Sequence, residues 1–111
     1  MFHITLNRIH DKIRITEGDE ALTLAVEGDA MRMVAGLSQA QKQLQSLNNN
    51  STEDEANGAA LYFAAVIFGK EQAEKLLEFY RGDAGCVINV CGKYFEQRLG
   101  KLITKAQKKT K

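Results

Sequence analysis

The hydrophobic period of the chain changes near Asp29, and this change sets the fold class. Before Asp29, apolar and polar residues alternate, as they do in half-buried β-strands. The alternation falls in three short runs: Phe2, Ile4 and Leu6; Ile13 and Ile15; and Leu22, Leu24 and Val26. After Asp29, apolar residues recur at helical spacing. The sequence therefore predicts an α+β fold, mainly α, with a small N-terminal antiparallel β-sheet followed by a bundle of about four helices.

Two or three short strands are expected in the N-terminal part, with connections at 7–12 and 17–20. Both stretches contain turn-forming residues, and loops this short favour antiparallel neighbours over a parallel crossover. Because a sheet this small is not stable alone, we expect it to cap one side of the helices.

The first helix is predicted to begin at about Asp29, whose side chain suits an N-cap. Its apolar residues at helical spacing are Met31, Val34, Leu37, Leu44 and Leu47. A polar loop at 48–52 follows. Thr52 and Glu55 match the reciprocal capping pattern that opens a helix, here roughly 53–68. From Ala59 onward this second helix is apolar nearly all round, which predicts a position at the centre of the core.

Gly69 and Gly82 suit the left-handed position that ends a helix. Between them a third helix is predicted to pack through one stripe, which comprises Ala73, Leu76, Leu77 and Tyr80. Asp83 is the expected cap of a fourth helix that runs to near Lys108, a length of about 35–40 Å.

Three glycines, Gly85, Gly92 and Gly100, fall within the fourth helix, each at a cost of roughly 1 kcal/mol relative to alanine. They either permit close approach of a second surface or simply weaken a solvent-facing side, and Gly85 fits equally well in the preceding turn.

The 111 residues fit a single domain, with a β-rich part at 1–27 and a helical part at 28–111. The predicted core residues are Leu61, Phe63, Val66, Ile67, Phe68, Leu76, Leu77, Val87, Val90, Cys91, Phe95 and Leu102. Residues 1–92 hold 8 Lys and Arg against 13 Asp and Glu, whereas residues 93–111 hold 7 against 1. The tail from about 101 is therefore basic, which also suits the negative end of a helix dipole.

No group of residues in the sequence predicts catalysis, a cofactor or a metal site. His3 and His10 have opposite strand parity, and the spacing of Cys86 and Cys91 matches no zinc pattern and disfavours a disulfide. The acids at 53–55 suit a hard cation less well than they suit the positive end of a helix dipole. We therefore expect reduced thiols and no enzymatic activity, and an enzyme would need a polar pocket that the sequence does not suggest.

The longest apolar run, at 59–68, is far shorter than the ~20 residues that a membrane span needs, and no signal peptide is recognisable. A cytoplasmic protein without membrane contact is expected.

The sequence at 68–80, FGKEQAEKLLEFY, followed by VCGKYF at 90–95 and ITKAQ at 103–107, resembles small tail assembly chaperone-like proteins of phages and prophages of Gram-positive bacteria. The resemblance covers about the C-terminal half of the chain and rests on the composition and order of these segments, not on a chemical motif. It implies a non-enzymatic protein that binds the phage tape measure protein, assists tail-tube subunits in tail assembly and works in the host bacterial cytoplasm.

The residues predicted to contact a partner protein are Tyr80, Tyr94, Ile103, Lys101 and Lys105. Self-association as a homo-oligomer is also expected, because the apolar arc of the fourth helix is wide. The alternative is a small basic-tailed nucleic-acid-binding or regulatory phage protein, which predicts DNA binding that weakens with salt. Because exposed aromatics are not interleaved with the lysines, protein binding is favoured over nucleic acid.

Overall fold

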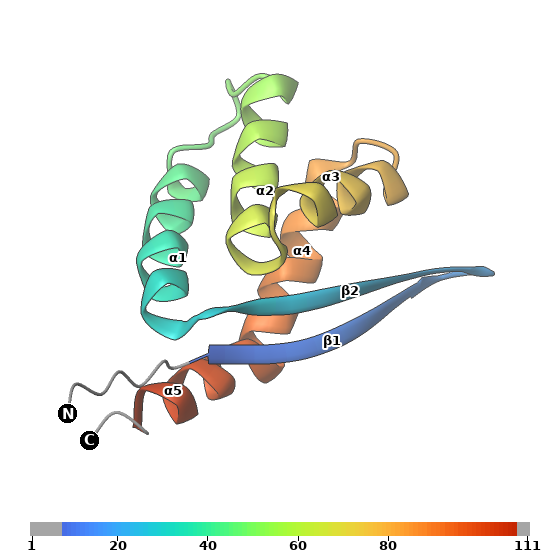
Figure 1. The fold of residues 1–111 in the computed structure, drawn as a ribbon. Helices are drawn as coiled ribbons and strands as arrows, with labels where there is room; N and C mark the ends of the chain where they lie inside the picture. The colour runs from blue at the N-terminus through green and yellow to red at the C-terminus, as the bar shows by residue number, and fades with distance from the viewer. Residues whose placement is uncertain (1–7, 109–111) are drawn as a thin grey trace.

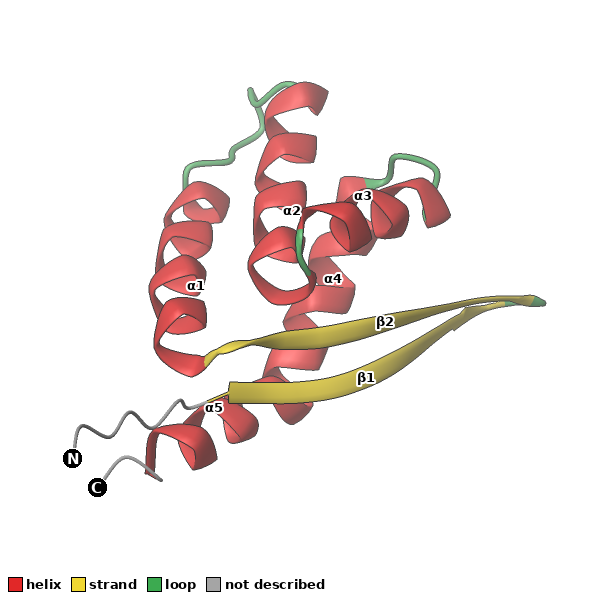
Figure 2. Cartoon of the chain, in the orientation of Figure 1, coloured by secondary structure: helices red, strands yellow, loops and turns green. Residues whose placement is uncertain are grey.

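The computed structural model describes residues 8–108, which form a β-hairpin followed by helices (Figure 1). The predicted α+β, mainly α fold is confirmed. The elements are β1 (Arg8–Glu17), β2 (Glu20–Asp29), α1 (Ala30–Gln45), α2 (Glu53–Phe68), α3 (Lys70–Phe79), α4 (Ala84–Tyr94), the π-helical segment η1 (Phe95–Leu99) and α5 (Gly100–Lys108). Figure 2 shows α1, α2 and α3 above the hairpin, α4 passing behind its strands, and α5 below it. The predicted run at 2–6 and His3 lie outside the described residues.

The hairpin pairs its strands in one continuous antiparallel register, from Arg8 opposite Asp29 to Glu17 opposite Glu20. The predicted turn at 17–20 is confirmed, with Gly18 at a φ of 59°. The inner face carries Ile9, Leu24 and Val26, each at most 3% exposed. It therefore packs against the helices, as expected of the sheet.

The predicted connection at 7–12 is wrong, because Arg8 to Lys12 belong to β1. Asp11 occupies an inward position between Ile9 and Ile13 and is only 9% exposed. A carboxylate at that position interrupts the apolar alternation, so one long strand resembles two short runs with a polar link.

Helix α2 lies at the centre, between α1 and α4 (Figure 1), and also contacts α3 and β2. Its residues Ala60, Ala64 and Ile67 are at most 1% exposed and belong to the core cluster. The prediction of a central second helix is therefore confirmed, and its apolar circumference is explained by neighbours on several sides.

The predicted helix boundaries are largely confirmed by their caps. Asp29 accepts a hydrogen bond from the backbone N–H of Arg32 at 3.0 Å, and Asp83 accepts one from Cys86 at 3.2 Å. Thr52 and Glu55 form the reciprocal capping box. Gly69 and Gly82 have φ values of 88° and 82°, which glycine adopts without strain.

The fourth helical segment extends to Lys108 as predicted, but it is not α-helical throughout, because five of its residues form the π-helical segment η1. The backbone N–H of Gly100 donates to the carbonyl oxygen of Phe95, an i to i+5 bond. A Cβ atom at Gly100 would lie 3.2 Å from that oxygen, so glycine relieves crowding in the wide turn. The path bends here, and α5 runs against β1 and α1 instead of continuing along α4 (Figure 1).

Most predicted core residues are buried or partly buried, but Phe95 is 39% exposed and does not belong to the core. Met31 and Val34 on α1 are also exposed, at 62% and 39%. The apolar residues of α1 are spread over more than one face, and its fully covered positions are Ala30, Met33 and Ala40.

Candidate functional site

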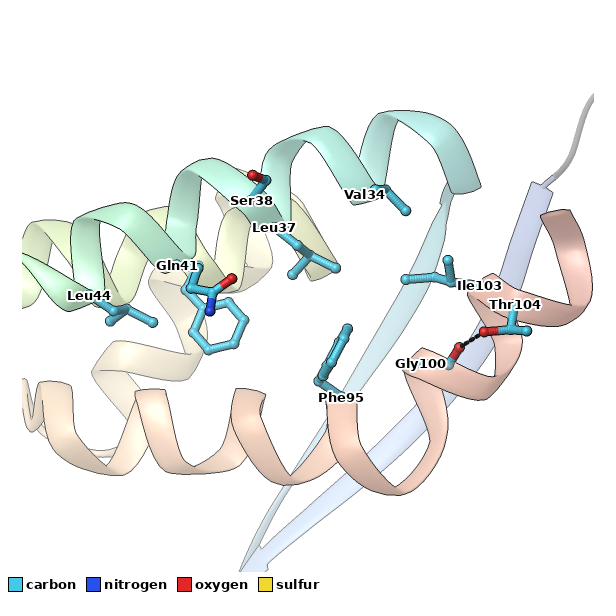
Figure 3. A pocket seen from close by; sticks show the side chains of 10 residues that line it. Val34, Leu37, Ser38, Gln41, Leu44, Phe95, Gly100, Ile103 and Thr104 are labelled. Carbon is cyan, nitrogen blue, oxygen red and sulfur yellow. Dashed lines mark hydrogen bonds between the residues drawn. The ribbon is translucent and has the colours of Figure 1, made fainter.

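An open apolar groove lies between α1 and the bent C-terminal helix, with a volume of about 530 Å³. Its lining residues are Val34, Leu37, Ser38, Gln41, Leu44, Phe63, Phe95, Gly100, Ile103 and Thr104. Figure 3 shows Leu37 and Phe95 pointing into this space from opposite sides, with Ile103 directed into it from α5. The three walls come from α1, α2 and the η1–α5 path.

Two local features shape the groove. Gly36 lets α1 approach α2 closely, because a Cβ atom at this position would lie 2.8 Å from Cγ1 of Val66. On the other side, the π-helical turn redirects the chain, so that α5 runs beside α1 and Phe95 stands at the bend. The walls therefore meet near the core and leave Val34 and Phe95 open to water.

The lining of the groove carries no charged side chain. Val34 and Phe95 are each 39% exposed, whereas Ile103 is 6% exposed and forms part of the wall. Among the polar lining groups, the hydroxyl of Thr104 already donates to the carbonyl oxygen of Gly100 at 2.9 Å. Such a surface suits apolar side chains of another molecule better than a polar small molecule.

A basic border adjoins the groove. Lys101 and Lys105 line a second hollow of about 610 Å³, which shares Phe95, Gly100 and Thr104 with the groove. Glu96 is the acidic residue of that hollow. Along the opposite wall, α1 carries Lys42 one turn beyond Ser38 and has no acidic residue, whereas Arg32 projects from the opposite face of α1.

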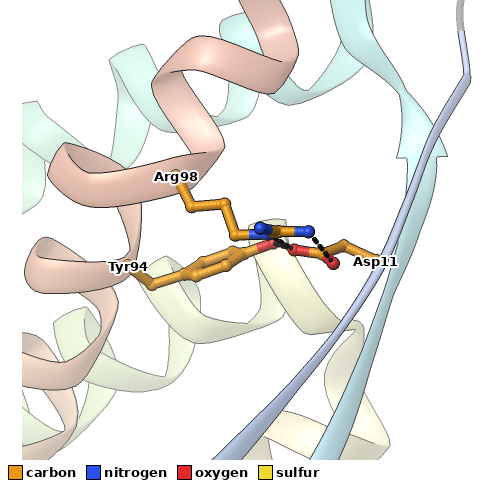
Figure 4. Close-up of polar contacts among 3 residues, drawn as sticks. All are labelled: Asp11, Tyr94 and Arg98. Atoms are coloured by element: carbon orange, nitrogen blue, oxygen red, sulfur yellow. Dashed lines mark hydrogen bonds and ion pairs between the residues drawn. The ribbon is translucent and has the colours of Figure 1, made fainter.

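A buried polar cluster ties the bend to the hairpin. The Asp11 carboxylate accepts a hydrogen bond from the Tyr94 hydroxyl at 2.7 Å and two from the Arg98 guanidinium, at 2.5 and 2.9 Å. Figure 4 shows Tyr94 and Arg98 reaching from the helix towards Asp11 on the strand. Through these bonds β1 holds both ends of the region in which the helix bends.

The electrostatics of this cluster favour the ionised aspartate. The hydrogen bond from Arg98 outweighs burial and lowers the pKa of Asp11 to about 2. Burial and the neighbouring carboxylate raise the pKa of Tyr94 above its usual value. At neutral pH the cluster is therefore a charged acceptor saturated by its donors, an arrangement that suits positioning of the bend.

The structure separates the predicted contact residues into three groups. Ile103, Lys101 and Lys105 lie together at the groove and its basic border. Tyr94 is 8% exposed and its hydroxyl is bound to Asp11, so it supports the site from behind. Tyr80 is half-buried at the end of α3 and lines neither hollow.

The opposite wall of the groove is not predicted from the sequence. Val34 and Leu37 are expected only as members of a helical stripe, and Phe95 is expected in the core. Helical spacing marks core and groove residues alike, and the bend that exposes Phe95 leaves no periodic signal. Gly36, within the first helix, is the one local sign that another helix passes nearby.

The cysteines and His10 are the remaining residues that the sequence offers for chemistry. Neither Cys86 nor Cys91 forms a disulfide. Burial raises the pKa of Cys91 to about 12, and a hydrogen bond to Asp83 raises the pKa of Cys86, so both stay thiols at neutral pH. His10 pairs with Glu27 on the exposed face of the hairpin at 2.9 Å. Within residues 8–108, no three His, Cys, Asp or Glu side chains gather as metal ligands would.

In the described part of the chain, none of the helices has the length and apolar character that crossing a bilayer requires. Comparison with known protein families found no match, and searches of curated proteins and of solved structures found none either. The chemistry of the groove and its border is therefore the basis for a functional proposal.

Proposed function

We propose that this protein is a non-enzymatic assembly chaperone that binds an amphipathic helix of another polypeptide in the groove between α1 and α5. The observation that carries the proposal is the open apolar lining, in which Val34 and Phe95 remain 39% exposed. Covering apolar surface contributes about 25 cal/mol per Å², so an occupant that buried these side chains would be stabilised there.

The dimensions of the groove favour a helix as the occupant. The lining residues of α1 extend from Val34 to Leu44, a stretch of eleven residues that spans about 15 Å of helix axis. A partner helix of about three turns has the same length and would present apolar side chains at positions i, i+3, i+4 and i+7. Ridges of side chains on helical walls pack naturally against such a helix.

The finer proposal is a role in phage or prophage tail assembly. It is supported by the resemblance of 68–80, 90–95 and 103–107 to tail assembly chaperone-like proteins. In that role the groove would cover helices of the tape measure protein in the host cytoplasm until tail-tube subunits assemble around it. A chaperone of this kind needs an exposed apolar surface of its own, and the groove supplies one.

Co-expression with the tape measure protein of the same phage or prophage genome tests the proposal. The expected result is a several-fold rise in soluble tape measure protein when the chain is present. Phe95→Ala should lower this gain strongly, because Phe95 is a large exposed side chain at the groove. Tyr62→Ala is the matched control, since Tyr62 is 37% exposed on α2 and does not line the groove.

Circular dichroism and thermal unfolding of both variants would show that they fold. If the unmodified chain leaves the tape measure protein insoluble, the tail assembly role is wrong. If Phe95→Ala and Tyr62→Ala protect the tape measure protein equally well, the groove is not the binding site.

A further inference from the structure

The charged residues around the groove are mostly positive. On one side α1 carries Lys42, which lies one helical turn beyond the lining residue Ser38, and within residues 30–45 it has no acidic side chain. On the other side Lys101 and Lys105 line the hollow that joins the groove at Phe95, with Glu96 as the acidic neighbour. These three lysine side chains are exposed, so their charge acts on whatever approaches the groove.

The apolar lining and the basic borders recognise different parts of the same occupant. The lining lacks charge, so the face that enters the groove must be apolar. The flanks of a helix lying there would pass between the residues of α1 and those of α5. Because both borders are positive, acidic flanks would be attracted and basic flanks repelled.

We infer that the groove selects an amphipathic helix with acidic flanks: about three turns long, apolar along one stripe, and bearing Glu or Asp on both sides of it. The inference rests on the proposed helix-binding function and adds the charge of the partner. The apolar stripe supplies most of the affinity, and the borders determine which helices are accepted and how fast they bind.

Three labelled synthetic helices test this selection. They share one apolar stripe of three turns and differ only in their flanking residues, which are Glu, Gln or Lys. Fluorescence anisotropy with the full chain at low salt should rank their affinities Glu above Gln above Lys, with about tenfold between the extremes. At about 0.5 M salt the difference should shrink to about twofold, because exposed charges are screened.

Charge reversal of the border sharpens the test. Lys101→Glu combined with Lys105→Glu should abolish or invert the preference between the Glu and Lys helices. The matched control is Lys70→Glu with Lys75→Glu, which reverses two exposed lysines on α3 outside both hollows and should leave the ranking unchanged.

The outcomes separate the inference from the function on which it rests. Equal, salt-independent binding of the three helices, sensitive to Phe95→Ala, would overturn the acidic partner and keep the helix-binding groove. No binding of any helix, together with full protection by Phe95→Ala in co-expression, would overturn both. Duplex DNA that displaces the Glu helix through Lys101 and Lys105, or a dimer that Phe95→Ala dissociates, would also overturn the inference by giving the groove another occupant.

Discussion

Two helix contacts of this protein are both built from apolar residues at helical spacing, yet one is closed and the other is open. Where α4 packs on α2, the contact is closed, and Ala60, Ala64, Val87 and Cys91 are each at 0% exposure. Where the C-terminal path passes α1, the contact is open, and Val34 and Phe95 keep more than a third of their surface. The same periodic pattern therefore yields a sealed interface in one place and a groove in the other.

The difference arises from side-chain size and from the course of the backbone. Small side chains on α2 let α4 approach until no space remains. Beyond Tyr94 the π-helical turn directs α5 towards β1 and α1, and the cluster around Asp11 holds this bend. The groove is thus a consequence of a fixed backbone deviation, and it persists only while that deviation is held.

The largest effect is expected when the same substitution, valine to alanine, is made at the closed contact and at the open contact. Val87→Ala on the closed side should destabilise the protein by about 2–3 kcal/mol, because it removes two buried methyl groups and leaves a cavity. Val34→Ala on the open side should cost less than about 1 kcal/mol, because Val34 is already partly in water. Urea unfolding monitored by circular dichroism measures both. Similar losses would mean that the groove is closed in solution.

The sequence predicts the closed contact better than the open one. The helix ends at Asp29, Thr52, Gly69 and Asp83 depend on local hydrogen bonds or backbone angles, and those signals are readable within a few residues. The central position of α2 follows from its apolar circumference. Most of the fold is therefore predictable from short stretches of the chain, each of which carries its own signal.

The open contact depends on pairs that are distant in the chain. Asp11 finds Arg98 and Tyr94 across more than 80 residues, and nothing near Asp11 in sequence indicates that a carboxylate would face inward. The same cluster explains why the predictions of a connection at 7–12 and of a buried Phe95 are wrong. Asp11 interrupts the apolar alternation of β1, and its bonds to Tyr94 and Arg98 position the bend that exposes Phe95. Lys101, Lys105 and Ile103 are predictable because charge and spacing are local, whereas Val34 and Leu37 require the tertiary fold.

The next expected effect comes from releasing the bend. Asp11→Asn removes the charge that Arg98 binds and should destabilise the protein at pH 7 by about 1–2 kcal/mol, allowing for solvent around the exposed guanidinium. Folding lowers the pKa of Asp11 from 3.8 to about 2, so its contribution is complete above the unfolded value and is lost as pH falls from about 4 to about 2.

Urea unfolding of the unmodified chain and of Asp11→Asn at several pH values measures this effect. The difference between them should narrow as pH falls from 5 towards 2, and Glu27→Gln on the exposed face of the hairpin should serve as a neutral control. A difference that stayed constant with pH would contradict the ionised cluster. If Asp11→Asn also weakens helix binding, the bend and the groove are coupled.

An effect of comparable size is expected where α1 and α2 meet. Gly36→Ala would place a methyl group 2.8 Å from a stiff, β-branched Val66, so either the helices separate or the side chain strains. We expect a net loss of about 1–2 kcal/mol, since overpacking exceeds the gain in helix propensity. The combination with Val66→Ala should recover most of the loss in a double-mutant cycle measured by thermal unfolding. Additive losses would show that this close approach does not hold the wall of the groove.

The smallest effect should have the opposite sign. Gly92 lies within α4, and a Cβ atom added there meets nothing within 4 Å, so Gly92→Ala should raise stability by about 0.5–1 kcal/mol through helix propensity. Partner binding separates the two interpretations of the glycines in the fourth helix. If Gly92 simply faces solvent, the Gly92→Ala variant should be more stable in unfolding measurements and should protect the tape measure protein as well as the unmodified chain in co-expression. Gained stability with lost protection would instead identify the Gly92 face of α4 as a second contact surface, and the open groove would then be one of two interfaces.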